Sequence, residues 1–299
     1  MENLLSILTP TYNRSKELPR LYDSLCTQSV RDFVWVVVDD GSTDGTRVLI
    51  QSLKTKAPFR ISYIYQQNGG KHTALNTGLR EISTELTMIV DSDDWLTPDA
   101  VMTIGQYHEK YRLRDDLCGF SFLRKYPDGR INGNPFPEDE LEGNYIDIRI
   151  NSGDLYADKA EVFYTKCLRE FPFPVYDKEK FLGEDIVWMR MARRYRMIHI
   201  NRAIYIGDYQ PDGLTQNRRV HNIQSPLGCM HRAEEYLHPD VKLSVRFRFA
   251  LQYIVYGKFA GYTSAVLLRK SPSERLTALC VIPGNILYRK WKNKYRTSK

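Results

Sequence analysis

The stretch LTMIVDSDD, Leu86 to Asp94, decides the fold that we expect for this chain. Its apolar run stops abruptly in three carboxylates, Asp91, Asp93 and Asp94. A short apolar run bounded by polar residues is typical of a buried strand in a parallel sheet, and in open α/β sheets ligands bind beyond the carboxyl ends of the strands. Carboxylates gathered there repel one another unless a cation lies between them, and their hard oxygens suit Mg²⁺ or Mn²⁺. The stretch therefore predicts a metal site that holds a phosphate-bearing ligand.

The same pattern occurs three more times before this stretch. Apolar runs at residues 4–9, 33–38 and 61–66 each lead into a turn rich in Gly, Asn, Asp or Ser, and then into a helical pattern. Four strand–turn–helix units within about 100 residues imply right-handed crossovers and a parallel sheet. We therefore expect an α/β fold with a mostly parallel sheet flanked by helices.

Polar side chains follow each of these strands, so the carboxyl edge of the sheet is the expected crevice. The GxGxxG and GxxxxGK[ST] patterns are both absent, which disfavours a dinucleotide oxidoreductase and a P-loop ATPase. The residues that we expect at this edge are Thr11, Tyr12, Asn13, Arg14, Asp39, Asp40, Asn68, Lys71, Asp91 and Asp93.

Composition narrows the class of protein. The chain is 42% apolar and 26% charged, which indicates a globular protein, and no apolar run approaches the length of a membrane span. The first residues lack the basic segment of a signal peptide, so we expect synthesis and residence in the cytoplasm. The five cysteines form no CxxC pair, which predicts reduced, mostly buried thiols rather than disulfides or a thiolate zinc site.

The net charge of +7 is unevenly distributed. Residues 241–299 hold 13 lysines and arginines against one acid, Glu274, so this segment carries +12 and the preceding residues carry −5. Near the end of the chain, Leu287, Tyr288, Trp291 and Tyr295 share one face of a helix whose remaining surface is basic. This pattern is typical of a helix at an anionic membrane surface, and we expect a peripheral protein at the inner face of the plasma membrane. We expect no nucleic-acid partner.

The alternation of strands and helices ceases near residue 216. We therefore divide the chain into an α/β domain, 1–215, and a helical, membrane-associating region, 216–299. Before that boundary, residues 171–195 end in a helix whose first turn carries Glu184 and Asp185. Acids in a first helical turn are favoured by the helix dipole, so a purely structural role for Asp185 competes with a catalytic one.

Five motifs, in order and spacing, resemble the family 2 glycosyltransferases, which are inverting enzymes with a GT-A fold. The resemblance covers residues 3–215 and implies transfer of a sugar from a nucleotide sugar, most simply a UDP-sugar, to the hydroxyl of a saccharide or lipid-linked acceptor in bacterial surface-glycan assembly. It also implies a Mn²⁺ or Mg²⁺ cofactor, and it makes residues 1–215 the nucleotide-sugar-binding catalytic domain. The motifs are LSILTPTYNRSKELPRLYDSL, VVVDDGSTDGT, QQNGGKHTALNTGL, DSDDWLTPDA and FLGEDIVW.

Carried over residue by residue, the resemblance implies roles for the polar edge. Asp91 and Asp93 match the family's DxD motif, with Asp93 on the metal and Asp91 toward ribose and metal, and Asp185 matches the catalytic base. Asp39 and Asp94 would brace their turns. The expected contacts of the donor nucleotide are Thr11, Tyr12, Arg14, Asp40, Asn68, Lys71 and Asp91, with Asp40 accepting from a uracil N–H.

This chemistry is physically reasonable. Breaking an anomeric C–O bond expels a diphosphate, whose growing charge a divalent cation neutralises, and one carboxylate suffices to take the acceptor's proton in a single displacement. The alternative is a non-catalytic nucleotide-binding module that recruits partners through its basic tail.

Overall fold

In the computed structural model the chain forms two compact units that are interleaved in the sequence. We call them the sheet unit and the helical unit, and the structure describes residues 3–153, 157–207 and 218–295. The sheet unit consists of Met1–Asn144, Tyr156–Pro172 and Met191–Tyr209, and the helical unit of Tyr145–Leu155, Phe173–Arg190 and Gln210–Lys299. Two segments from before residue 216 thus belong to the helical unit, and the functional division at residue 215 stays a prediction.

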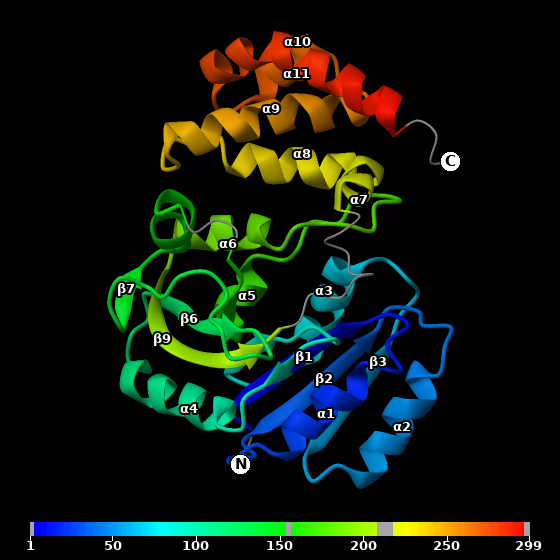
Figure 1. Ribbon diagram of the computed structural model, residues 1–299, viewed down its shortest axis with the longest axis vertical. Helices are drawn as coiled ribbons and strands as arrows, with labels where there is room; N and C mark the ends of the chain where they lie inside the picture. The colour runs from blue at the N-terminus through cyan, green and yellow to red at the C-terminus, as the bar shows by residue number, and fades with distance from the viewer. Residues whose placement is uncertain (1–2, 154–156, 208–217, 296–299) are drawn as a thin grey trace. The chain divides into compact units, whose positions relative to one another are not determined.

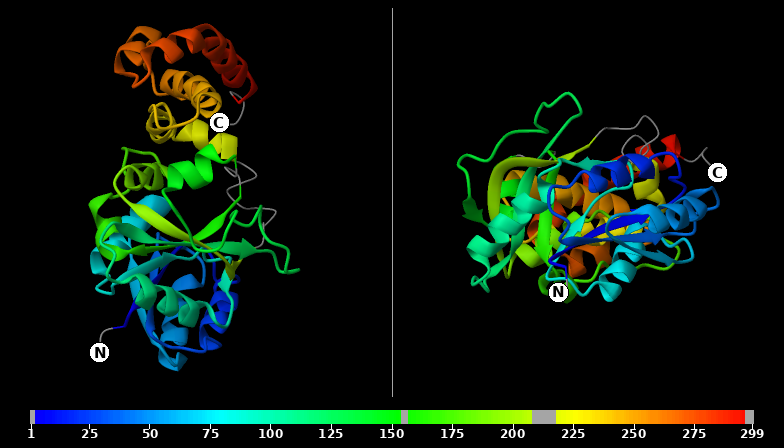
Figure 2. Two further views of the ribbon diagram at one scale, coloured as in Figure 1. Left: turned by 90° about the vertical axis from the view of Figure 1, so that its left-hand side faces the viewer. Right: turned by 90° about the horizontal axis from the view of Figure 1, so that it is seen from below.

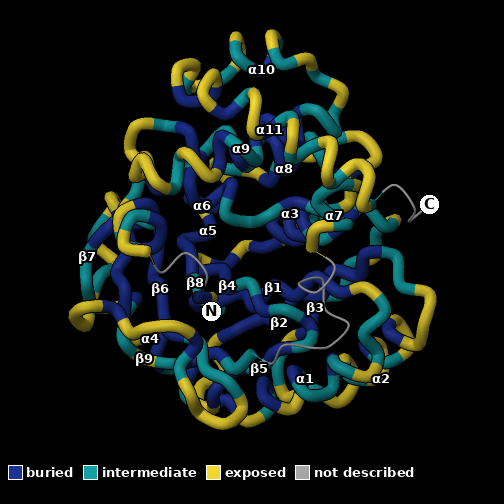
Figure 3. The backbone as a smooth tube through the Cα atoms, turned by 45° about the horizontal axis from the view of Figure 1, so that its top comes forward, coloured by how far each residue is buried: buried dark blue, intermediate teal, exposed yellow. Residues whose placement is uncertain are grey.

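The first half of the sheet is parallel, as the sequence predicts. β1 (Leu5–Thr11) lies between β2 (Phe33–Asp39) and β4 (Leu86–Ile89), and β3 (Arg60–Tyr65) pairs with β2; all three pairings are parallel (Figure 1). β1 and β2 are buried along their whole length, which explains their uninterrupted apolar sequences (Figure 3). The carboxyl ends of these four strands therefore meet at one edge.

The second half of the sheet is mixed. β8 (Lys159–Tyr164) runs antiparallel to both β4 and β6 (Leu117–Lys125), whereas β9 (Arg196–Ile206) runs parallel to β6. The short strands β5 (Trp95–Leu96) and β7 (Leu141–Gly143) pair antiparallel with β9. The sheet order is β3-β2-β1-β4-β8-β6-β9-β5, with β7 also on β9. The α/β class is thus confirmed, with a larger antiparallel share than we expect from the sequence.

Helices of the sheet unit connect and cover these strands. α3 contacts β1 and β2, and its Gly78 allows a close approach, because a Cβ there would lie 2.3 Å from Leu8 Cδ1. All five cysteines of the chain are free, and every one except Cys26 is buried, as predicted. The helices are α1 (Leu18–Cys26), α2 (Thr46–Lys56), α3 (Lys71–Glu81), α4 (Ala100–Tyr111) and α5 (Thr165–Glu170).

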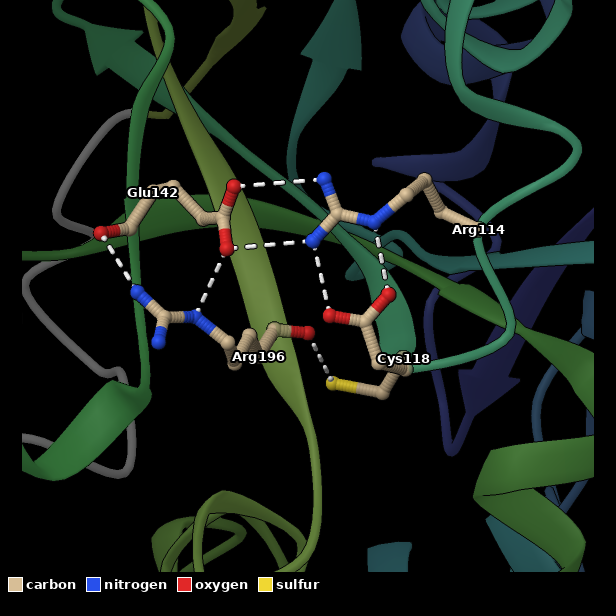
Figure 4. Close-up of polar contacts among 5 residues, drawn as sticks. Arg114, Cys118, Glu142 and Arg196 are labelled. Atoms are coloured by element: carbon tan, nitrogen blue, oxygen red, sulfur yellow. Dashed lines mark hydrogen bonds and ion pairs between the residues drawn. The ribbon is translucent and has the colours of Figure 1, made fainter.

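An ion-pair network ties β7 to the sheet (Figure 4). The Arg114 guanidinium donates to both carboxylate oxygens of Asp116 at 2.7 Å and to Glu142 of β7 at 3.1 and 3.3 Å. Arg196, at the start of β9, pairs with the same Glu142 carboxylate at 2.8 Å, and the Cys118 thiol donates to the Arg196 carbonyl. The network fixes β7 on the sheet, beside β9.

The helical unit is built around α9 (Leu243–Phe259), which contacts α8 (Pro226–Glu235), α10 (Ser264–Lys270) and α11 (Glu274–Lys294) (Figure 2). Its other helices are the π-helical η1 (Ile146–Asn151), α7 (Arg218–Gln224) and the greater part of α6 (Asp185–Ala192). Within the described residues, no helix combines the length and apolarity that crossing a bilayer requires.

The apolar face that we expected to meet a membrane packs inside this unit instead. Tyr288 contacts Phe259 with ring centroids 4.9 Å apart, and Trp291 contacts Tyr256 at 6.0 Å. Leu287 and Tyr295 are likewise only partly exposed. The prediction was wrong about this face because helix periodicity identifies an apolar stripe but does not tell whether a neighbouring helix or a lipid covers it.

Gly119 is a sensitive point of the sheet. Its φ is +148°, and an added Cβ would lie 1.9 Å from the Val162 carbonyl oxygen of β8. We expect Gly119→Ala to lower the free energy of unfolding by about 3 kcal/mol or more, measured by urea denaturation. The control is Gly105→Ala in α4, where the nearest atom lies 3.8 Å away, and it should be neutral or stabilising by up to about 1 kcal/mol. Equal stability of the two variants would contradict the expectation.

Candidate active site

The loops after β1 and β2 hold each other through hydrogen bonds. Asn13 has a φ of +53°, its N–H donates to Ser42 Oγ at 2.9 Å, and its side-chain oxygen accepts from the Thr43 N–H at 2.8 Å. The Arg14 N–H donates to Thr46 Oγ1 at 3.0 Å. The polar residues after β1 therefore stand on a fixed backbone at the carboxyl edge.

Asp39 braces its turn, as predicted. The carboxylate is fully buried and accepts from the Ser42 N–H at 2.8 Å and from the Tyr63 hydroxyl at 2.7 Å. Burial and the negative charge of Asp39 raise the pKa of Tyr63, so this hydroxyl remains a donor at neutral pH. The hydrogen bonds of Asp39 thus link the turn after β2 to β3.

The neighbouring Asp40 organises the loop after β3. Its carboxylate accepts from the backbone N–H groups of Gly69 and Gly70 at 2.8 Å each and from Gln66 Nε2 at 2.7 Å, and its carbonyl accepts from Asn68 Nδ2 at 2.8 Å. A carboxylate has about four acceptor positions, so one remains on this buried group for a further donor. The expected uracil N–H would be that fourth donor.

A glycine allows this close fit of the two loops. Gly41 has a φ of +81°, and a Cβ there would lie 2.8 Å from the Asn68 backbone nitrogen. The glycine that follows the two aspartates in the sequence therefore meets both a conformational and a steric requirement.

The turn after β4, Asp91–Ser92–Asp93, which we call the DSD turn, carries a short ion pair. Lys71, the first residue of α3, places Nζ 2.5 Å from Asp91 Oδ1. Burial raises the pKa of the Asp91 carboxyl, but the charge and hydrogen bond of Lys71 outweigh it, so the pKa lies below its ordinary value. For Asp93, burial and the nearby Asp91 charge raise the pKa, and the Arg14 guanidinium lies 3.9 Å from the carboxylate. The negative charge of Asp91 is therefore balanced by a nearby cation more fully than the negative charge of Asp93.

Asp94 braces the turn through long-range partners, as predicted. Its Oδ2 accepts from Arg124 Nη2 at 2.5 Å and from the Tyr205 hydroxyl at 2.7 Å, and the same hydroxyl accepts from the Asp91 N–H at 3.1 Å. The Arg124 guanidinium lies 3.8 Å above the Tyr205 ring. Burial raises the pKa of Asp94 to about 6 in spite of Arg124. The turn is thereby held by β6 and β9.

A further arginine holds the turn from α1. Arg20 donates to the Asp93 carbonyl, and its guanidinium lies 3.9 Å above the Trp95 ring. The sequence analysis did not single out Arg20, Arg124 or Tyr205. Of these three residues, only Arg20 could have been expected near this edge from the sequence, because it lies in the helix that follows the first strand.

Two residues beside the site have buried polar atoms that lack a hydrogen-bond partner within the described part of the chain. These atoms are Thr11 Oγ1 and both ring nitrogens of His72. Burial lowers the pKa of His72, so its ring is neutral near pH 7. Tyr12, by contrast, is 48% exposed. At this edge, β1 thus ends in the buried hydroxyl of Thr11, and the accessible ring of Tyr12 follows it.

The donor set at the DSD turn fits a divalent cation that is shared with a ligand. Among the residues described, no group of three or more His, Cys, Asp or Glu side chains could hold a metal. Mg²⁺ is, however, commonly held by one or two carboxylates together with substrate phosphates and water. Of the two carboxylates, Asp93 would be the more available ligand, because Lys71 already occupies an oxygen of Asp91, whereas the guanidinium paired with Asp93 is 3.9 Å away.

Asp185 lies in the helical unit, at the start of α6, and is held by two residues that the sequence analysis missed. Arg232 of α8 donates to both of its carboxylate oxygens at 2.6 Å, and the Tyr236 hydroxyl donates to Oδ2 at 2.5 Å. Burial would raise the pKa of Asp185, but Arg232 and Tyr236 outweigh burial and lower it. The carboxylate is therefore ionised and fixed in orientation, and its contacts are side-chain contacts rather than a helix cap.

The segment before Asp185 is attached to the same helix. Glu179 accepts from the N–H groups of Leu227 and Gly228 in the first turn of α8 at 2.7 and 2.8 Å. After it, Arg190 pairs with Glu235 at 2.6 Å. Anions are favoured at a helix N-terminus, so Glu179 both caps α8 and positions the chain that leads to Asp185.

Comparison with known proteins identifies the family. A family model described as Glycosyl transferase family 2 matches residues 6–143. The GalNAc(5)-diNAcBac-PP-undecaprenol beta-1,3-glucosyltransferase of Campylobacter jejuni is 36% identical over 309 residues, which cover 95% of this chain and 95% of that protein. The chain belongs to glycosyltransferase family 2. Two further relatives named as glycosyltransferases match this chain over only 16% and 31% of their own lengths.

Solved structures of other glycosyltransferases share the fold of this family 2 chain. S. aureus TarS 1–349 in complex with UDP-GlcNAc has a TM-score of 0.62 at 19% identity, covering 99% of this chain and 92% of that one. The mannosyltransferase PcManGT from Pyrobaculum calidifontis, in complex with GDP-Man and Mn²⁺, has a TM-score of 0.59 at 18% identity, covering 98% and 84%. These likenesses confirm the expected GT-A fold.

The Asp185–Arg232 pair should dominate local stability. Arg232→Gln leaves a mostly buried carboxylate without its cation, and we expect it to lower the free energy of unfolding at pH 7 by about 3 kcal/mol. Arg190→Gln is the matched control, because its pair joins the same two helices, α6 and α8, but is more exposed, and it should cost at most about 1 kcal/mol. Urea denaturation measures both values, and equal losses would contradict the expectation.

The stability of Arg232→Gln relative to wild type should also depend on pH. In the wild type the pKa of Asp185 is lowered by folding, so the unfolded chain binds the proton first and the pair's contribution is lost as pH falls below the ordinary value of 3.8. Without Arg232, burial raises the pKa of Asp185, so the folded variant takes up the proton first. The stability difference between wild type and Arg232→Gln should therefore narrow as pH falls from 7 toward 4. A difference independent of pH would exclude this role of the charge.

Proposed function

We propose that this protein is an inverting, metal-dependent glycosyltransferase that moves a sugar from a UDP-sugar to a hydroxyl of a lipid-linked saccharide in bacterial surface-glycan assembly. The observation that carries the proposal is the 36% identity, over nearly the full length of both chains, to a beta-1,3-glucosyltransferase whose acceptor is undecaprenol-linked. The neighbour that binds UDP-GlcNAc supports the choice of nucleotide.

The donor nucleotide would lie at the carboxyl edge of the sheet unit. Tyr12 is exposed enough to stack on a base, and Thr11 Oγ1 and the remaining acceptor position of Asp40 offer hydrogen bonds. Asn68 holds the Asp40 loop, and Lys71 brings a cation to the DSD turn. Together with Arg14, these groups suit an anionic nucleotide that has a hydrogen-bonding base.

Asp93, with Asp91, would hold a Mn²⁺ or Mg²⁺ ion against the diphosphate of the donor. When bound, that ion supplies positive charge for the leaving diphosphate. Lys71 and Arg14 add fixed positive charge at the same turn, so this chain's own residues also stabilise the leaving group. A Mn²⁺-bound neighbour of the same fold agrees with this assignment.

Asp185 would be the base. It is ionised at neutral pH, so it can accept the acceptor's hydroxyl proton as the new C–O bond forms and the anomeric C–O bond to the diphosphate breaks. Arg232 holds both of its oxygens and so fixes its orientation. One displacement inverts the anomeric centre, which gives a β-linkage from an α-linked donor. No second carboxylate nucleophile is required.

The helical unit would place the enzyme at the inner face of the plasma membrane. A lipid-linked acceptor lies in the bilayer, and residues 241–299 carry +12. Each lysine or arginine close to an anionic leaflet contributes about 1 kcal/mol to attraction.

Asp185→Asn distinguishes the transferase from a non-catalytic nucleotide-binding module. We expect UDP-sugar affinity within about twofold of wild type and a loss of transfer of about 10²- to 10⁴-fold, measured by titration calorimetry and acceptor glycosylation. Glu184→Gln, the adjacent acid, is the control and should retain most of the activity. Wild-type transfer by Asp185→Asn would exclude Asp185 as the base, and a wild type without transfer to any acceptor would favour the module.

A nucleotide-release screen tests donor and metal together. With UDP-, GDP- and dTDP-sugars, we expect the fastest release from a UDP-sugar, inhibition by EDTA and recovery with Mn²⁺ or Mg²⁺. Asp93→Asn should raise the metal concentration needed for half-maximal rate, because it removes a ligand charge. Asp23→Asn, an exposed carboxylate on α1, is the control and should leave that concentration unchanged. Release that is insensitive to EDTA would count against the metal.

A further inference from the structure

The rotation of α11 about its axis is fixed by close packing. A Cβ on Gly284 would lie 2.6 Å from Ile254 Cγ2 of α9, so this glycine marks the line of closest approach. Leu276, Thr277 and Cys280 are buried on the same face. This packing determines which residues of α11 point outward.

Three large apolar side chains occupy the outward face. Leu279, Ile282 and Ile286 are 71%, 74% and 63% exposed, and within the helical unit nothing among the described residues covers them. At about 100° per residue, all three lie within about 40° of the direction opposite Gly284. They therefore form one continuous stripe, which we call the outer stripe.

Within the described length of α11, the charged residues that flank the outer stripe are all basic. Arg275 precedes it on the same side of α11, and Arg289 and Lys290 follow it; all three are exposed. By the same count they lie within about 60° of the stripe's direction. The one acid of residues 241–299, Glu274, lies about 80° from the Gly284 direction, on the flank of the packed face.

We infer that the outer stripe of α11 docks this protein on an anionic phospholipid bilayer. α11 lies parallel to the surface, Leu279, Ile282 and Ile286 enter the headgroup region, and the three basic residues bind lipid phosphates. This inference rests on the proposed function, to which it adds the contact surface and the lipid class. An exposed apolar stripe with basic flanks matches the chemistry of a membrane interface, whereas an acid-free basic rim is unfavourable against a second copy of the same face.

Vesicle binding tests the docking surface. The full chain is sedimented with phosphatidylcholine vesicles that contain or lack phosphatidylglycerol. We expect the variant Leu279→Gln/Ile282→Gln/Ile286→Gln to bind the anionic vesicles at least about tenfold more weakly than wild type. The matched control is Val48→Gln/Leu113→Gln, two apolar residues of the sheet unit that are 75% and 87% exposed, and it should bind as wild type does.

Replacing the three basic residues tests the contribution of charge to vesicle binding. Arg275→Gln/Arg289→Gln/Lys290→Gln should reduce binding to anionic vesicles to the level seen without phosphatidylglycerol. Thermal melting checks folding, and Ile282→Gln alone, which changes one exposed side chain, should give a smaller loss in the same direction. Absence of wild-type binding, or binding unchanged by the stripe variants, would overturn the inference.

Two further results distinguish membrane docking from the alternative explanations of the outer stripe. Loss of a dimer in the stripe variant, with vesicle binding retained, would assign the stripe to a second copy and overturn the inference. Nucleotide release without lipid should be equal in wild type and stripe variant. Failed vesicle binding with intact nucleotide release would therefore exclude the docking surface and leave the proposed transferase. Failed nucleotide release with intact vesicle binding would exclude the proposed transferase and leave the docking surface.

Discussion

Charge repulsion among carboxylates at the carboxyl edge is the constraint on which the rest of the sheet unit depends. Asp39, Asp40 and Asp94 each have hydrogen-bonding partners from another strand or loop, and Asp91 has Lys71. These partners join the ends of the strands and so fix the loops. The charge of Asp93 has the weakest compensation, a guanidinium 3.9 Å from its carboxylate, which is why we propose Asp93 as the metal ligand.

The local features of this edge could be predicted from the sequence. Strand ends, turn glycines and the acids that follow them are close neighbours in the chain, so the apolar runs and the motif at Asp91 and Asp93 place them correctly. Asp39 and Asp94 brace their turns, as expected. The roles of the individual site residues in binding and catalysis remain predictions.

The distant features could not be read from the sequence. Arg124 and Tyr205 reach Asp94 from strands far along the chain, and Arg232 reaches Asp185 over 47 residues. No periodicity connects such pairs, because tertiary packing decides them. The same limit explains the error about α11, where the apolar face that seemed free was the one covered by α9.

The attachment of residues 179–190 to α8 also bears on how this fold can be recombined. Glu179, Asp185 and Arg190 each form bonds with α8 or its first turn. A chimera that exchanged the C-terminal helices of two relatives at residue 216 would separate these acids and bases from their partners. The natural unit of exchange is the helical unit, Tyr145–Leu155, Phe173–Arg190 and Gln210–Lys299, which is discontinuous in the gene although it forms one compact body.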